Sequence, residues 1–296
     1  MLPHLKSQQG FTLVEMIMVI VITGIIGGIV AVFIRAPVQG YVDSARRAEM
    51  SDIADTAMRR LGRDLRTAVP NSVRVTSASA TYFEFLPTRD GGRYRVDSGS
   101  GAGNCAAAGF IGDELSFASA DECFEIVGPS MDFNPGDAIV IGSTQADGSL
   151  PFQSVSSATG VRRIIAAAGV GSAKPIVLMT SSVAFPASAE LPGHRFEVVP
   201  GDQQAVTYAC LNSGVDGNGD GAGTLTRYWA YGFNVTQVSP LALGGTNAIL
   251  ADKVSACNFV YDTSNQRNGL MAVSLTITRS NESVSLYHEI HVNNIP

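Results

Sequence analysis

The stretch SQQGFTLVEMIMVIVITGIIGGIVAVFIR (residues 7–35) decides how the amino-terminal part of this 296-residue chain folds. No charged side chain occurs between residues 16 and 34. As a helix, Phe11 to Ile34 would extend about 36 Å, which is enough to cross a hydrocarbon core about 30 Å thick. The stretch therefore predicts a transmembrane helix.

A cleavable secretory signal peptide is the alternative interpretation of this stretch. The apolar run is too long for the usual apolar region of such a peptide, and no A-x-A-like cleavage site follows it. Lys6 lies just before the run, and the rest of the chain has the composition of an exported domain. Positive charge on the leader therefore places residues 1–10 on the cytoplasmic side of the membrane.

Glu15 is unusual because it lies five residues into the apolar run. A carboxylate at membrane depth is unfavourable by a few kcal/mol or more, so it needs a partner of opposite charge. The apolar run offers no Lys or Arg before Arg35. Cleavage between Gly10 and Phe11 would create a new amino group on Phe11. We expect Glu15 of one subunit to pair with the Phe11 amine of its neighbour and so to set the register of adjacent helices.

The motif GFTLVE (residues 10–15), followed by some 20 apolar residues, resembles the prepilin signal of type IV pilins and type II secretion pseudopilins. Gly10, Phe11 and Glu15 match the three positions of that signal. The resemblance implies cleavage after Gly10 by an inner-membrane prepilin peptidase and N-methylation of Phe11. It also implies packing of the helix with other pilins or pseudopilins by the inner-membrane pilus assembly machinery.

The helical pattern continues beyond the membrane span. Apolar residues recur at three- and four-residue spacings between Met50 and Leu65, which predicts one apolar stripe. Gly27-Gly28 and Pro37 predict local bending or melting, and Pro70 predicts the end of the helix. The helix would reach about 60 residues, or about 90 Å.

From Val73 onward the pattern changes to short β-branched and aromatic runs, among them TYFEFLP (81–87), ELSF (114–117) and SVSLYHEIHV (283–292). Clusters of Gly, Pro, Asn, Asp and Ser separate these runs, which predicts antiparallel strands. The predicted fold is α+β and pilin-like, with the long helix laid along one face of an antiparallel β-sheet domain. The predicted parts are a leader (1–10), a transmembrane or filament-core helix (11–35), an amphipathic helix (36–70) and a β-rich head (71–296).

Four cysteines, with no C-x-x-C pair, predict two disulfides in an exported protein. Three pairings are compatible with the sequence. Pairing of nearest neighbours, Cys105 with Cys123 and Cys210 with Cys257, is the working hypothesis.

The only metal-like motif is D-x-N-x-D-G, formed by Asp216, Asn218, Asp220 and Gly221. Alternating oxygen ligands and a Gly at the sixth place are typical of a Ca²⁺ loop. The twelfth place is Arg227, where such a loop has a bidentate Glu. A Gly/Asn/Asp hairpin turn is the alternative, so no cofactor is expected apart from this candidate Ca²⁺ site.

Taken together, these patterns favour a structural subunit over an enzyme. The net charge of −6 disfavours nucleic-acid binding, and no P-loop, dinucleotide fingerprint or G-x-S-x-G elbow occurs. Residues 45–75 and RYWAYGF (227–233) are similar to minor pilin-like proteins of the mannose-sensitive haemagglutinin (MSHA) pilus system. The alternatives are a J-type pseudopilin of type II secretion and a membrane-tethered periplasmic enzyme or adhesin.

Overall fold

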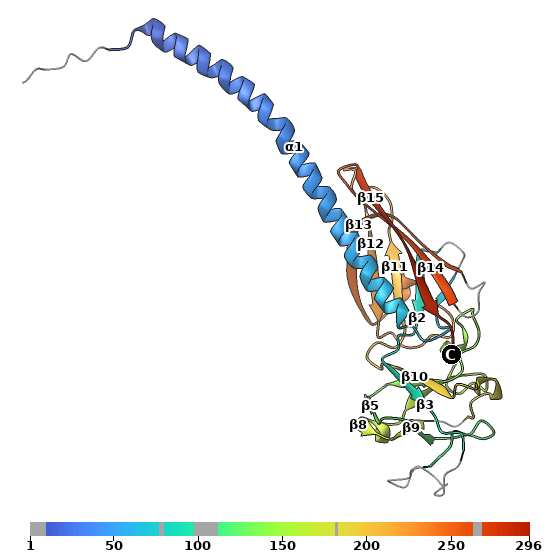
Figure 1. Cartoon of the computed structure of the whole chain (residues 1–296). Coiled ribbons are helices and arrows are strands. Elements are labelled where there is room, and N and C mark those ends of the chain that lie inside the picture. The colour runs from blue at the N-terminus through green and yellow to red at the C-terminus, as the bar shows by residue number, and fades with distance from the viewer. Residues whose placement is uncertain (1–9, 77–79, 98–111, 181–182, 263–267) are drawn as a thin grey trace, which may run out of the picture. The chain divides into compact units, whose positions relative to one another are not determined.

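One helix, α1 (Leu13–Arg66), contains both the apolar stretch and the amphipathic segment (Figure 1). The fold comes from a computed structural model that describes residues 10–76, 80–97, 112–180, 183–262 and 268–296. The chain divides into two compact units, Met1–Glu49 and Met50–Pro296. The α+β class predicted from the sequence is confirmed, because the carboxyl-terminal part of α1 packs on antiparallel sheets.

Helix α1 differs from the prediction at its end. It stays helical through Gly27-Gly28 and through Pro37, so of the bending or melting predicted there, melting does not occur. It ends at Arg66, four residues before Pro70. The reason lies in the proline ring, which clashes with the carbonyl four residues earlier in a helix, and that carbonyl belongs to Arg66. The Thr67 hydroxyl donates instead to the Asp64 carbonyl at 3.0 Å.

Within the described residues of the head, the strands fall into three sheets, all of them antiparallel. The seven-stranded sheet has the order β1 (Arg74–Val75), β2 (Tyr82–Phe85), β11 (Val206–Leu211), β12 (Gly223–Trp229), β13 (Thr246–Asp262), β14 (Asn268–Arg279) and β15 (Glu282–Asn293). The six-stranded sheet has the order β3 (Asp90–Arg93), β10 (Arg195–Val199), β6 (Ala138–Val140), β7 (Arg162–Ile165), β9 (Ile176–Thr180) and β4 (Cys123–Glu125). The third sheet pairs β5 (Met131–Phe133) with β8 (Gly171–Lys174). Short 3₁₀ helices lie at Leu150–Phe152, Ala167–Gly169, Ala187–Ala189 and Pro240–Ala242.

The seven-stranded sheet carries the last turns of α1 on one face (Figure 1). The predicted apolar stripe is the buried side of this part of the helix, formed by Met50, Ala54, Ala57, Met58, Leu61, Gly62 and Leu65. Opposite the stripe, Phe83 and Tyr208 stack with ring centroids 5.5 Å apart, and Phe259 meets Phe83 edge-on at 4.8 Å. These side chains belong to one core that excludes water from between helix and sheet.

The second and third sheets were not foreseen as a separate part of the head. Their strands all lie between β2 and β11 in sequence and enclose a core of their own, centred on Phe124, Phe133 and Phe196. ELSF (114–117) is not a strand, whereas β5 and β8 form from sequences that lack a strand pattern. Both differences arise because the pairing partner, and not the local pattern, decides whether so short a segment becomes a strand.

A third cluster of buried residues, including Phe152, Ala138 and Leu86, joins the two parts of the head. Arginine side chains reinforce this junction by stacking on aromatic rings. The Arg74 guanidinium lies 3.6 Å from the centroid of Phe152, and that of Arg162 lies 3.8 Å from the centroid of Phe233. The two parts are therefore joined by packed side chains and not by a linker alone.

Candidate assembly and processing site

The processing motif lies at the start of α1. Thr12 directly precedes the helix, and its hydroxyl accepts a hydrogen bond from the Glu15 backbone N–H at 3.4 Å. A Thr followed three residues later by Glu is a capping box, in which both side chains serve the unpaired N–H groups of the first turn. Glu15 also lies at the positive end of the helix dipole. Sequence reasoning assigned Glu15 but missed Thr12, although the T-x-x-E spacing was available to find it.

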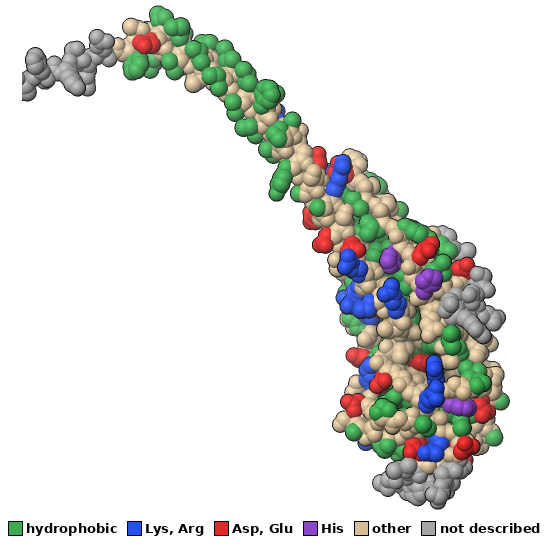
Figure 2. Space-filling model, in the orientation of Figure 1, with side chains coloured by type: hydrophobic (Ala, Val, Ile, Leu, Met, Phe, Trp, Pro, Cys, Tyr) green, Lys and Arg blue, Asp and Glu red, His purple; other side chains and the backbone are tan. Residues whose placement is uncertain are grey.

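The side chains around this motif are exposed. Phe11 is 82% exposed, and the large apolar residues of α1 up to Val42 are all exposed (Figure 2). By length and composition the helix is able to cross a membrane, and the apolar window that meets this criterion has no buried residue. An exposed surface of this kind requires lipid or other apolar helices around it.

Glu15 makes no ion pair within the described part of the chain. The nearest basic residue along the span, Arg35, is 20 positions away, which is about 30 Å along a helix. A cationic partner for the carboxylate at the same depth must therefore come from another group, such as the terminal amine of a neighbouring chain.

Residues 5–31 match the family model for the prokaryotic N-terminal methylation motif. The chain carries a type IV pilin-like prepilin signal. Comparison with curated proteins and with solved structures finds no significant match. The signal supports a type IV pilin- or pseudopilin-like subunit, and it implies processing by a prepilin peptidase and assembly with other pilins.

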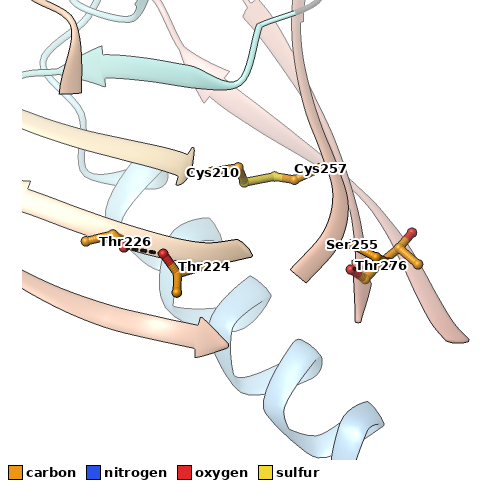
Figure 3. The surroundings of a disulfide bond; sticks show 6 residues. All are labelled: Cys210, Thr224, Thr226, Ser255, Cys257 and Thr276. Atoms are coloured by element: carbon orange, nitrogen blue, oxygen red, sulfur yellow. Dashed lines mark hydrogen bonds between the residues drawn. A yellow bond between two sulfur atoms is a disulfide. The ribbon is translucent and has the colours of Figure 1, made fainter. Parts of the chain in front are cut away.

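Cys210 and Cys257 form a disulfide with Cα atoms 6.1 Å apart (Figure 3). It joins β11 to β13, which lie on either side of β12 in the sheet. Cys210 pairs with Leu225 of β12, whereas Cys257 lies three residues beyond Val254, the partner of Gly223 at the start of β12. The two cysteines are 47 positions apart in the sequence. In the chain-entropy model, a disulfide that closes a loop of this length stabilises the fold by about 4 kcal/mol. The other predicted pair, Cys105–Cys123, lies outside the described residues because Cys105 is at a position that the structure does not describe.

The D-x-N-x-D-G motif forms the loop of the β11–β12 hairpin, and its carboxylates are used within the fold. Asp216 Oδ1 accepts from the backbone N–H groups of Asn218 and Asp220, both at 2.9 Å. Asp220 accepts from the Ser280 N–H at 2.7 Å and from Lys253 Nζ at 3.1 Å. In the described residues no group of three or more His, Cys, Asp or Glu is placed to hold a metal ion.

Two further residues of this motif have structural roles that differ from those of a Ca²⁺ loop. A Cβ on Gly221 would lie 2.0 Å from the Lys253 carbonyl oxygen, so the sixth place is Gly because β13 passes close by. Arg227, at the twelfth place, donates to Asp64 Oδ2 at 2.9 Å and links β12 to α1. The hairpin alternative therefore accounts for the motif.

We expect Asp220→Asn to lower the melting temperature of the full chain in detergent at pH 7. The Ser280 N–H and the Lys253 ammonium lower the pKa of Asp220, so its contribution is present above the ordinary value of 3.8 and is lost as the pH falls through the lowered value. The difference between wild type and variant should therefore shrink in acid. Asp252→Asn, which changes a neighbouring exposed carboxylate, is the control. A melting temperature that rises with millimolar Ca²⁺ in wild type but not in Asp220→Asn would contradict the hairpin assignment.

Proposed function

We propose that this chain is a minor pilin-like structural subunit that serves the assembly of a type IV pilus of the MSHA type. The observation that carries the proposal is the prepilin signal, at the start of a long exposed apolar helix. The resemblance of residues 45–75 and of RYWAYGF (227–233) to MshO, a minor pilin-like protein of the MSHA system, supports the finer assignment. The role is assembly and not catalysis.

The energetic basis of assembly is burial of the exposed part of α1. Each fully buried Val, Leu, Ile or Phe side chain contributes about 1.5–3 kcal/mol when it leaves water, and in lipid close packing takes over this role. Neither the burial of apolar side chains nor their close packing fixes how far one helix is shifted along the next. An ion pair between Glu15 and the Phe11 amine of a neighbour does fix the shift, because an offset of one turn would leave both charges unpaired at membrane depth.

The location follows from the same features. The precursor crosses the inner membrane once, with its leader in the cytoplasm and its head in the periplasm, and the cleaved subunit then enters the pilus. Its partners are the prepilin peptidase, other pilins or pseudopilins and the inner-membrane assembly machinery. A head with three sheets is bulky for tight helical packing, which favours a low-copy position in the filament.

Intact-mass analysis of the protein from cells with and without a prepilin peptidase tests the proposal. With the peptidase we expect loss of residues 1–10 and gain of one methyl group on Phe11, because the motif presents Gly10 and Phe11 ahead of the helix. Without the peptidase the full precursor mass should remain. A functional protein that keeps its first ten residues in both strains would contradict the proposal and favour a membrane-tethered periplasmic protein.

A further inference from the structure

A pocket of about 220 Å³ lies in the part of the head that contains the six-stranded sheet. Its lining includes Arg93, Arg95, Val96, Asp97, Val127 and His194. Backbone hydrogen bonds fix its walls, because Val127 N–H donates to the Arg93 carbonyl at 2.8 Å and Arg95 N–H donates to the Glu125 carbonyl at 3.1 Å. We refer to this pocket as the Arg93 pocket.

Arg93, which lines the Arg93 pocket, lies directly opposite a second arginine on the neighbouring strand. Arg93 of β3 and Arg195 of β10 are register partners, so their side chains are on the same face of the sheet. Like charges in this arrangement are destabilising. Neither arginine makes an ion pair with a carboxylate within the part of the chain that the structure describes. A bound anion would relieve the repulsion.

One buried polar atom of the lining residues also lacks a partner. Among the described residues, the His194 Nδ1 atom is buried without a hydrogen bond. Its neighbour Tyr94 is only 2% exposed, and burial raises the pKa of Tyr94 to about 12, an effect that a hydrogen bond from the Leu191 backbone offsets in part. Unsatisfied buried polar groups are rare in native folds, so the unpaired Nδ1 atom beside a pocket indicates a place for a ligand.

His194 is held in a backbone conformation that few residues other than Gly adopt. Its φ angle is 49°, and its N–H and carbonyl bond to Leu191 and Tyr94, both at 2.9 Å. The imidazole meets the Tyr94 ring edge-on, with centroids 5.6 Å apart. A residue kept in such a conformation by its neighbours is a frequent feature of binding sites.

The remaining walls indicate the class of anion. Val96 and Val127 are 39% and 51% exposed and give the pocket an aliphatic side, which does not suit a fully hydrated inorganic ion. Arginine binds carboxylates through two parallel N–H donors. Asp97 can accept hydrogen bonds from hydroxyl groups. Figure 2 shows basic side chains beside a histidine in the region where Figure 1 labels β3 and β10.

From these observations we infer that the Arg93 pocket binds a small organic carboxylate whose body has an apolar side and hydroxyl groups. Arg93 binds the carboxylate, His194 donates or accepts a hydrogen bond beside it, and the two valines contact the apolar side. Arg195 adds positive potential from the adjacent strand. The site is in the head, and it is independent of the processing and assembly motif.

Titration calorimetry of the full-length chain in detergent tests this inference, with glucuronate as the probe at constant ionic strength. Its ring presents C–H groups to the valines and hydroxyls to Asp97. We expect saturable binding with a Kd of about 1 mM or tighter, weaker binding of inorganic phosphate, and no binding of glucose. Arg93→Gln should weaken glucuronate binding about tenfold or more. Arg60→Gln, the same change at an exposed arginine of α1, should leave it unaltered.

Circular dichroism checks that each variant remains folded, and His194→Gln provides a second variant that removes the imidazole. No saturable signal from glucuronate would overturn the inference. Equal affinity for phosphate would overturn the carboxylate assignment, and unchanged binding by folded Arg93→Gln would overturn the site. Cleavage after Gly10 is measured in a separate experiment. A negative glucuronate titration therefore leaves the proposed assembly role intact, and an uncleaved protein leaves the Arg93 pocket intact.

Discussion

Glu15→Ala is expected to be inserted into the membrane and cleaved after Gly10, yet to enter filaments about tenfold less than wild type or worse. Insertion should persist because the substitution removes a charge from the apolar span. Assembly should fail because the Phe11 amine of the neighbouring subunit then has no counter-charge at membrane depth, which is unfavourable by about 2.5–3.5 kcal/mol. Immunoblotting of sheared filaments against the membrane fraction measures the ratio.

Two matched variants distinguish register setting from other roles of Glu15. Asp52→Ala removes an exposed carboxylate from the same helix outside the span and should assemble normally. Thr12→Ala removes the hydroxyl of the capping box at a cost of about 1 kcal/mol of helix stability but keeps the carboxylate. If Thr12→Ala were as defective as Glu15→Ala, the carboxylate would act through the helix start, and the register argument would be wrong.

Glu84→Ala is expected to lower the free energy of unfolding by about 3–5 kcal/mol, because it leaves a buried arginine without a counter-charge. Glu84 and Arg74 are 1% and 7% exposed at their side chains, and Arg74 Nη2 lies 2.6 Å from Glu84 Oε2. The Tyr231 hydroxyl donates to Glu84 Oε1 at 2.8 Å. Urea denaturation of the full chain in detergent measures the loss.

The double variant Arg74→Met/Glu84→Leu distinguishes the cost of leaving one buried charge unpaired from the net contribution of the ion pair to stability. Burial raises the pKa of Glu84 even though Arg74 and Tyr231 oppose the shift, so desolvation outweighs the attraction. Removing both charges should therefore restore much of the stability that Glu84→Ala loses. Glu289→Ala, at an exposed position of β15, should change the unfolding free energy by less than about 0.5 kcal/mol. If Glu84→Ala were as stable as wild type, Arg74 would be solvated without its partner, and the expected loss from an unpaired buried charge would be wrong.

Local patterns predicted the elements that depend on neighbouring residues. The apolar stretch, the stripe between Met50 and Leu65 and the long strands β14 and β15 all follow from side-chain periodicity. The length of α1 was harder to predict from the sequence, because Pro37 is tolerated inside the helix and Pro70 ends it four residues earlier, at Arg66. Short strands such as β5 and β8 depend on distant partners and lacked a local signal.

The candidate sites divide in the same way. Gly10, Phe11 and Glu15 are read from a contiguous motif, so the sequence by itself determined the processing and assembly signal. The D-x-N-x-D-G motif was ambiguous in the sequence, because the groups that donate hydrogen bonds to its Asp220 carboxylate belong to Lys253 and Ser280. Only the tertiary structure brought these residues to the loop. It also placed Arg93 opposite Arg195, about 100 positions apart in the chain, because strand pairing is decided by long-range contacts that no local pattern encodes.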